Sequence, residues 1–376
     1  MNRCFHIMED EKIIDRTIEM FEMVFPKENF FIVLLNGEKR YVSLRNNVVF
    51  IRTASEIKDY LPLSLSYHYF IIHYLRVDVA KLLTDFQHPN YCWIEWGADL
   101  YNNLLEYRGF PLLEDNELKN YLLKERWPYP LAIIRRKLGL YRRQRIVSRF
   151  IKRIRYFLPD STPDELPLLL HYYPEFSHLQ YKEIFYYPID EILGCELINK
   201  QCQGTNIMVN HSASPTGNHV GVFNRLERLE IQNRKIIVPI SYGMERVKKY
   251  IETKGHAILG EKLVPVKEFM PLEEYNKLML SANVFIYGHW RQEAVGNILV
   301  ALYIGGKVFL SSRSPMYSYY KRLGLHLWSL EEMDNESITV PLEQSLVEEN
   351  KSIIMAHYSK ERLLHLIETG FQVVKD

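Results

Sequence analysis

Two polar residues in the second half of the chain, Arg291 and Gln292, separate a strand pattern from a helix pattern. The apolar run 283–287 before them predicts a buried strand, and 293–304 after them predicts a helix. In an open α/β sheet, ligands bind beyond the carboxyl ends of the strands, where a helix N-terminus offers N–H groups to a phosphate. The guanidinium fork of Arg291 also suits phosphate oxygens. We therefore expect a phosphorylated ligand here, with contacts from His289, Arg291, Gln292, Gly296 and Asn297.

A loop of small residues after another predicted strand, 205–210, offers the same kind of contact. Its sequence, H-S-A-S-P-T-G-N (211–218), lets backbone N–H groups approach a phosphate closely. It is not a P-loop, because no Gly-Lys-Ser/Thr closes it. The contacts expected from this loop are Ser212, Ser214, Thr216 and Asn218. Tyr242 lies just beyond the predicted strand 236–240 and is expected to stack on the base of a nucleotide ligand.

Two carboxylates in the first half, Glu95 and Asp99, flank Gly97 at the end of a strand pattern rich in aromatic residues. Burial at such a position raises a carboxyl pKa into a range that suits a general base. Asp99 is therefore our first candidate for the base and Glu95 the second. His73, at the end of another apolar run, is the third. Structural alternatives stay open, since Asp99 suits a helix N-cap and a lone histidine on a strand is often only hydrogen-bonded.

The segment 135–155 contains ten Lys or Arg residues and no acidic residue, with apolar residues interleaved. This composition predicts a basic amphipathic helix on an anionic membrane surface, where each basic side chain contributes ~1 kcal/mol. A solvated helix face and a nucleic-acid surface are the alternatives. The net charge of +1 and the lack of a recognisable binding motif argue against nucleic acid. The residues expected to face a membrane or an acceptor are Arg135, Arg136, Arg142, Arg143, Arg145, Arg149, Lys152 and Arg153.

Strand patterns alternate with helix patterns in both halves, which predicts two doubly wound parallel sheets. The looser stretch 193–204 suggests a linker, so we expect domains 1–198 and 199–376, with the last helix packing back on the first domain. Hydrophobic residues make up 47% and charged residues 25% of the 376, as in soluble globular proteins. Two such domains without a GxGxxG fingerprint indicate a nucleotide-sugar transferase of the GT-B architecture, an α/β fold in which two Rossmann-like domains face each other across a cleft.

Metal-binding signals are missing from the sequence. No Asp-x-Asp motif is present, and the four cysteines lack metal-ligand spacing. We therefore expect no metal and no other cofactor, so cationic side chains and helix N-termini must stabilise a departing diphosphate. We also expect a cytoplasmic protein, because the chain shows no signal peptide and no apolar run long enough to span a bilayer.

Four blocks of the sequence carry a resemblance to one known family. They are I-E-W-G-A-D-L-Y (94–101), N-H-S-A-S-P-T-G-N-H (210–219), V-P-I-S-Y-G (238–243) and R-Q-E-A-V-G-N (291–297). In this order they resemble the bacterial TDP-N-acetylfucosamine:lipid II N-acetylfucosaminyltransferases, the 4-alpha-L-fucosyltransferases of glycosyltransferase family 56. Glu293-Ala294 stands where that family tends to have Gln-Gly.

The resemblance implies a GT-B fold and transfer of a deoxy-amino sugar such as N-acetylfucosamine (Fuc4NAc) from a TDP-sugar. It implies an undecaprenyl-diphosphate-linked oligosaccharide as acceptor, in bacterial surface polysaccharide synthesis. It also implies peripheral attachment to the cytoplasmic face of the inner membrane. Two alternatives stay open: a GT-B enzyme with another nucleotide-sugar donor or a soluble acceptor, and a non-enzymatic nucleotide-sugar binding protein.

Overall fold

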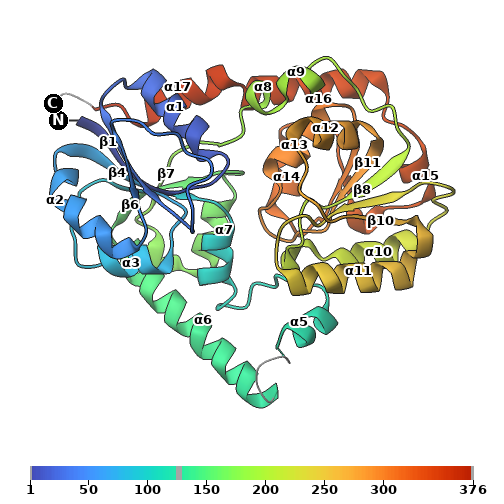
Figure 1. Ribbon diagram of the computed structural model, residues 1–376, viewed down its shortest axis with the longest axis horizontal. Helices are drawn as coiled ribbons and strands as arrows, with labels where there is room; N and C mark the ends of the chain where they lie inside the picture. The colour runs from blue at the N-terminus through green and yellow to red at the C-terminus, as the bar shows by residue number, and fades with distance from the viewer. Residues whose placement is uncertain (1, 124–128, 374–376) are drawn as a thin grey trace. The chain divides into compact units, whose positions relative to one another are not determined.

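The chain folds into two compact α/β units (Figure 1). The computed structural model describes residues 2–123 and 129–373. Unit 1 comprises Met1–Phe110, Arg135–Pro188 and Lys360–Asp376, and unit 2 comprises Pro111–Ile134 and Ile189–Ser359. The chain thus passes between the units several times, whereas the sequence suggested a single boundary near 198.

Unit 1 is built on a seven-stranded parallel sheet with the order β3-β2-β1-β4-β5-β6-β7. The strands are β1 (Asn2–Glu9), β2 (Asn29–Leu34), β3 (Val48–Ile51), β4 (Tyr67–His73), β5 (Tyr91–Glu95), β6 (Ile154–Pro159) and β7 (Gln180–Tyr181). Most of their residues are buried, as expected for a sheet covered on both faces. The strand order reverses between β1 and β4, and this switch point is where a doubly wound sheet binds its ligands.

Helices cover both faces of this sheet (Figure 1). They are α1 (Ile14–Val24), α2 (Leu61–Ser64), α3 (Val77–Leu83), α4 (Ala98–Leu100), α6 (Tyr129–Ile151), α7 (Glu165–Tyr172) and α17 (Lys360–Gly370), with short 3-10 turns at Ala54–Tyr60 and Pro174–Phe176 and a π-helical turn at Tyr101–Leu105. The last helix, α17, packs on α1 and buries Leu363, Leu366 and Ile367. Hydrophobic burial of this face explains why the end of the chain belongs to unit 1.

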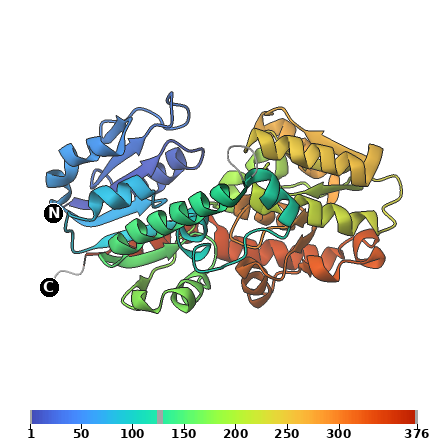
Figure 2. The same ribbon diagram turned by 90° about the horizontal axis from the view of Figure 1, so that it is seen from below.

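The basic segment forms α6, a single long helix that is green in Figure 2. It ends at Ile151, before the expected end at 155, and Lys152 and Arg153 lie in the turn that follows. The next residues enter β6, where Phe157 and Leu158 are fully buried. Burial in the sheet therefore overrides the helical pattern at this point. No helix in the described ranges 2–123 and 129–373 is long and apolar enough to cross a membrane.

Unit 2 is built on a six-stranded parallel sheet with the order β10-β9-β8-β11-β12-β13. The strands are β8 (Asn206–Val209), β9 (Ile236–Pro239), β10 (Leu263–Val266), β11 (Ala282–Tyr287), β12 (Lys307–Leu310) and β13 (Trp328–Ser329). The order reverses between β8 and β11, so these two strands frame the ligand-binding edge. They are the strands that precede the two loops selected from the sequence.

The helices of unit 2 also lie on both faces of its sheet (Figure 1). They are α5 (Asn116–Leu123), α8 (Ile189–Ile192), α9 (Gly194–Leu197), α10 (His219–Glu227), α11 (Glu245–Leu259), α12 (Leu272–Leu280), α13 (Val295–Tyr303), α14 (Pro315–Arg322), α15 (Asn335–Thr339) and α16 (Gln344–Tyr358). Apolar side chains of α10 and α11, among them Val222, Phe223 and Ile251, share one core with strand residues such as Val209 and Ile286. This core fixes the sheet edge from which the functional loops emerge.

Candidate functional site

Two loops of unit 2 are joined at its switch point by asparagine side chains. Asn210 follows β8, and its Nδ2 donates to the Gly217 carbonyl at 2.8 Å, while its Oδ1 accepts from the Gly288 N–H at 3.0 Å. Asn218 donates from Nδ2 to the Gly288 carbonyl at 2.9 Å. Both asparagines adopt a left-handed backbone, which asparagine tolerates better than most residues. The loop after β8 and the loop after β11 therefore form one rigid assembly.

The close approach of these loops requires glycine at Gly288. A Cβ there would lie 2.6 Å from the Gly217 carbonyl oxygen. Any side chain would separate the loops and break the hydrogen bonds of Asn210 and Asn218. The glycine is thus a packing requirement of the site.

Arg291 contacts the loop after β8 and also a carboxylate of its own loop, Glu293. Its Nη2 lies 2.9 Å from Oε2 of Glu293, and its Nε donates to Thr216 Oγ1 at 3.3 Å. The Thr216 hydroxyl donates to the same Glu293 oxygen at 2.6 Å, and Ser214 lies 2.7 Å from Thr216 through the hydroxyl oxygens. The structure thus brings together Arg291, Thr216 and Ser214, as expected, around a carboxylate that we did not select from the sequence.

Glu293 compensates the charge of Arg291. Burial alone raises the pKa of Glu293, but Arg291, His289, His211 and the Thr216 hydrogen bond together outweigh burial and hold that pKa well below its usual range. Glu293 is therefore ionised at neutral pH. Arg291 is only 8% exposed, so the ion pair lies largely out of water.

Three histidines, His211, His219 and His289, surround the same carboxylate. His289 is buried, and in the part of the chain that the structure describes neither of its ring nitrogens has a hydrogen-bond partner. Burial lowers the pKa of His289 to about 4 and that of His219 to about 3, so both rings are neutral at neutral pH. The His211 and His289 rings lie 5.5 Å apart between centroids. His211 and His219 are site residues that we did not select from the sequence.

His211, His289 and Glu293 offer donor atoms that all lie within 4.8 Å of one another. Two imidazoles and a carboxylate are a set that Zn²⁺ accepts. However, Glu293 already balances Arg291 and accepts from Thr216, so a divalent cation would bind beside a guanidinium. We therefore interpret the cluster as a place for an anionic ligand beside neutral histidines.

The other residues predicted from the sequence as ligand contacts lie at the start of α13 and in the loops after β8 and β9. Ala294 has a left-handed backbone (φ 65°), so α13 begins at Val295, and Gly296 and Asn297 lie in its first turn. Asn297 Oδ1 accepts from the Tyr275 hydroxyl at 2.8 Å, while the Gln292 carbonyl accepts from Arg291 Nη1. Ser212 is buried in the loop after β8. Tyr242 is 45% exposed, and its ring centroid lies 6.1 Å from that of His211.

In unit 1, Asp99 is buried and accepts three hydrogen bonds. Its Oδ2 accepts from the Leu75 N–H at 2.8 Å and from Trp93 Nε1 at 2.7 Å, and its Oδ1 accepts from the Trp96 N–H at 2.9 Å. Burial raises the pKa of Asp99, and the hydrogen bonds from Leu75 and Trp93 oppose that rise. Because both oxygens are occupied and the side chain is out of solvent, the geometry favours a positioning role over that of a general base.

Glu95 and His73 are also fully buried. One oxygen of Glu95 accepts from the Gly97 N–H, and the other has no hydrogen-bond partner among the described residues. Burial, followed by the negative charge of Glu165, raises the pKa of Glu95 well above its ordinary value. His73 lies 3.0 Å from His6 between ring nitrogens and also bonds the Tyr186 hydroxyl. Burial lowers the pKa of His73 well below the usual value, so its ring is a neutral member of a buried network.

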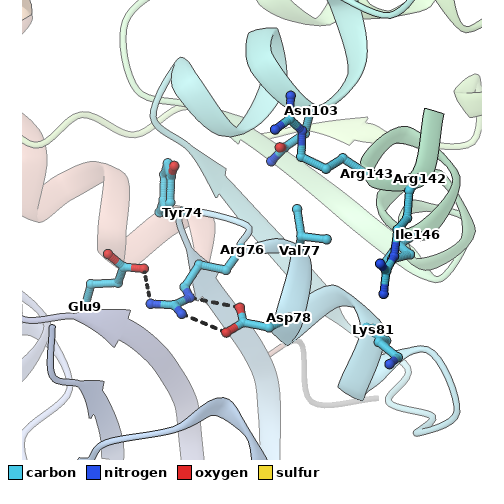
Figure 3. A pocket seen from close by; sticks show the side chains of 10 residues that line it. All are labelled: Glu9, Tyr74, Arg76, Val77, Asp78, Lys81, Asn103, Arg142, Arg143 and Ile146. Atoms are coloured by element: carbon cyan, nitrogen blue, oxygen red, sulfur yellow. Dashed lines mark hydrogen bonds and ion pairs between the residues drawn. The ribbon is translucent and has the colours of Figure 1, made fainter. Parts of the chain in front are cut away.

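An open pocket of about 620 Å³ lies in unit 1, beyond the ends of β1 and β4 (Figure 3). Its lining residues are Glu9, Tyr74, Arg76, Val77, Asp78, Lys81, Asn103, Arg142, Arg143 and Ile146. We identified only Arg142 and Arg143 from the sequence. The signal that could have found Glu9 and Arg76 is their place at the end of β1 and shortly after β4, the two strands at which the sheet order reverses.

One loop of this pocket is anchored by Asp99. The loop leaves β4 through Tyr74, whose left-handed backbone (φ 62°) is unusual for an aromatic residue and marks a constrained position. The next residue, Leu75, donates its N–H to Asp99, and Arg76 then reaches Glu9 at 3.0 Å and Asp78 at 2.7 Å (Figure 3). Asp99 therefore acts on the pocket through the backbone.

The outer side of α6 combines apolar and basic residues. Ile134, Leu138 and Tyr141, three and four residues apart, are 55%, 62% and 46% exposed. Arg135, Arg142, Arg145, Arg149 and Lys152 are exposed as well, whereas Arg136 pairs with Glu106 and Arg153 is half-buried. The apolar stripe flanked by basic side chains is the pattern of a helix that lies on a membrane surface.

No family model matches the sequence, and no curated protein matches it. Solved structures do match the fold. Trehalose-6-phosphate synthase OtsA is similar with a TM-score of 0.64 and 10% identity, over 99% of this chain and 100% of that one. Anabaena HepE in complex with UDP and glucose is similar with a TM-score of 0.61 and 9% identity, over 98% and 99% of the two chains. Sucrose-phosphate synthase from Thermosynechococcus elongatus gives 0.56 and 9%, over 99% and 95%. These likenesses and the two doubly wound sheets confirm the predicted GT-B fold.

Proposed function

We propose that the protein is a glycosyltransferase whose unit 2 binds a nucleotide-sugar donor. The observation that carries this proposal is the assembly of Arg291, Thr216 and Ser214 beside the N-terminus of α13, at the switch point of the sheet. A guanidinium and a helix N-terminus together suit a diphosphate. The likeness to HepE in complex with UDP and glucose, and to the two synthases, supports the same conclusion.

Donor binding exchanges one partner of Arg291 for another. The donor diphosphate takes over the guanidinium that Glu293 holds in its absence. Glu293 then lies beside His289, whose Nε2 is 3.5 Å from Oε1. Arg291 and the start of α13 together stabilise the departing diphosphate. The positive charge in this scheme comes from the chain itself, in keeping with a metal-independent transferase.

The general base is proposed to come from the pocket of unit 1. Asp99 remains the sequence-based prediction, but its side chain is fully buried and does not line the pocket. Glu9, at the end of β1, lines the pocket directly, with Arg76 at 3.0 Å from Oε1 and Asn36 donating to Oε2 at 3.0 Å. A carboxylate held there by two donors has the position needed to take a proton from an acceptor hydroxyl.

For the donor sugar and the acceptor, we propose the substrates implied by the family resemblance: a TDP-sugar such as TDP-Fuc4NAc and an undecaprenyl-diphosphate-linked oligosaccharide. The four sequence blocks support the donor. The apolar and basic stripe of α6 supports a lipid-linked acceptor and peripheral binding to the cytoplasmic face of a bacterial inner membrane.

The test compares TDP-, UDP- and GDP-sugars, first by thermal shift and then in a transfer assay with lipid-linked and soluble acceptors. We expect the largest shift with TDP-sugars and transfer only to the lipid-linked acceptor. Transfer to a soluble sugar phosphate would support the second candidate, a GT-B enzyme with a soluble acceptor. The similarity to a trehalose-phosphate synthase structure in complex with glucose-6-phosphate favours that candidate. Donor binding without transfer or donor hydrolysis would instead indicate a nucleotide-sugar binding protein.

A further inference from the structure

We propose that the pocket of unit 1 is a phosphate subsite, in which Lys81, Arg142 and Arg143 bind the phosphate or diphosphate group of the acceptor. The assignment of that group to the acceptor rests on the proposed function. The anion site itself rests on the charges and the geometry of the pocket.

The pocket carries more positive than negative charge. Four cationic and two anionic side chains line it, which leaves a net charge of +2. Arg76 donates to both oxygens of Asp78, at 2.9 and 2.7 Å, and to Glu9 at 3.0 Å. One cation therefore pairs with both carboxylates, as Figure 3 shows.

The other three cations have no such partner. Within residues 2–123 and 129–373, no side-chain hydrogen bond or ion pair involves Lys81, Arg142 or Arg143. The Nε of Arg143 is out of solvent and lacks an acceptor. A donor buried without an acceptor is destabilising, which fits a guanidinium arranged for a ligand that is not part of the chain.

Phosphate chemistry fits these donors better than other anions do. Two guanidinium groups can bind phosphate oxygens in a bidentate manner, and Lys81 adds a point charge. Asn103, a largely buried amide, also lines the pocket and offers a donor for a sugar hydroxyl. A volume of about 620 Å³ lies in the usual range of roughly 300–1,000 Å³ for small-molecule sites.

The source of the phosphate is suggested by the helix that supplies the arginines. Arg142 and Arg143 directly follow Tyr141 on α6, and Tyr141 and Leu138 belong to the exposed apolar stripe. A lipid-linked diphosphate would thus find its subsite next to the surface that lies on the membrane. A soluble sugar phosphate would use the same three cations but not the stripe.

The experiment titrates inorganic pyrophosphate into the full chain by calorimetry, with saturating TDP present to occupy the donor site. We expect the double variant Arg142→Gln/Arg143→Gln to lower pyrophosphate affinity at least about tenfold, about 1.4 kcal/mol. The matched control Arg145→Gln/Arg149→Gln removes the same charge from α6 outside the pocket and should keep the wild-type affinity. Circular dichroism confirms that each variant is folded. Equal affinities for both double variants would overturn the proposal.

Further variants separate the subsite from the proposed function and identify the phosphate source. Arg291→Gln should lower sugar transfer by about 10²–10³ while leaving this pyrophosphate affinity unchanged. If pyrophosphate binds the wild type only when TDP is absent, the donor loops are the only anion site and the subsite is wrong. In a third arm, Leu138→Gln/Tyr141→Gln is tested for binding to vesicles of equal parts phosphatidylcholine and phosphatidylglycerol. Loss of vesicle binding with unchanged pyrophosphate affinity supports the subsite with a lipid-linked phosphate. Unchanged vesicle binding supports it with a soluble sugar phosphate.

Discussion

The two units place cationic side chains at the switch points of their sheets in different ways. In unit 2, Arg291 is buried and paired with Glu293, inside loops joined by Asn210 and Asn218. In unit 1, Arg76 is paired but the three other cations of the pocket are not. A paired, buried cation becomes available only when a ligand displaces its partner, whereas unpaired cations attract an anion continuously. Anion binding in unit 1 should therefore weaken more with salt than binding in unit 2, because exposed charges are screened more strongly.

The largest effect is expected for Arg291, the single cation on which the proposed diphosphate site of unit 2 depends. Arg291→Ala should lower turnover by about 10²–10³, the loss typical of one donor to developing negative charge. The control is Arg228→Ala, an exposed arginine at the end of α10. Initial rates at saturating donor measure the effect. Near-wild-type turnover in Arg291→Ala would remove this residue from the diphosphate site.

The next effect concerns stability in unit 2. Glu293→Gln leaves a buried guanidinium without its counter-charge, and breaking such a pair costs about 3–5 kcal/mol. Because the folded-state pKa of Glu293 is depressed, its contribution is present above the ordinary carboxyl range and is lost as the pH falls below it. Urea unfolding at neutral pH should show the full difference from wild type. Equal stability of the two proteins would mean that the pair is not formed in solution.

In unit 1, Asp99→Asn distinguishes a positioning residue from a base. We expect a loss of about 2 kcal/mol of stability, since the N–H of Leu75 and the indole of Trp93 lose a charged acceptor. We also expect a raised KM for the acceptor, with a pH–rate profile of unchanged shape. Glu9→Gln should instead lower kcat. A kcat loss and altered profile confined to Asp99→Asn would restore the sequence-based assignment of the base.

The buried histidines of unit 2 predict a pH dependence of stability. Burial lowers the pKa of His289 to about 4, so between that value and the unfolded value near 6.5 only the unfolded state binds the proton. With respect to His289, the free energy of unfolding is therefore highest above about pH 6.5. It falls towards pH 4, by about 2 kcal/mol between about pH 7 and pH 5. His289→Gln should reduce this loss in denaturation curves recorded at several pH values. An unchanged slope would show that the ring is accessible to protons in the folded state.

The smallest effect per residue is expected on the outer side of α6. Each basic side chain near an anionic leaflet contributes ~1 kcal/mol, so Arg145→Gln/Arg149→Gln should weaken vesicle binding at low salt and lose this difference at high salt. Co-sedimentation with anionic vesicles measures it. If neither the two substitutions nor the salt concentration changes vesicle binding, the basic stripe is only a solvated helix face.

The sequence predicted the strand and the loop around Arg291 well because their signals are local. The strand, the polar loop and the helix around Arg291 follow directly in the chain, and each pattern is strong. We did not predict Glu293 as a site residue, because the sequence pattern placed it in the helix. The left-handed backbone of Ala294 instead makes the helix begin at Val295 and leaves Glu293 in the loop. A single backbone conformation thus decided whether this carboxylate faces solvent or Arg291.

The sequence performed less well in unit 1 because the decisive contacts there are not local. Asp99 is recognisable as a carboxylate at the end of a strand, but the donor Leu75 lies 24 residues away in the chain. The pocket likewise joins Glu9 of β1 with Arg142 and Arg143 of α6. A pattern within a short stretch of sequence cannot predict that these residues line one pocket, because that depends on the order of the strands.

The most direct test of a donor site in unit 2 is a calorimetric titration of TDP into the wild type, Arg291→Ala and the control Arg228→Ala. We predict that the wild type and Arg228→Ala bind TDP with the same affinity and that Arg291→Ala binds at least about tenfold more weakly. Equal affinity in all three proteins would contradict the account, because the loops after β8 and β11 would then not hold the diphosphate.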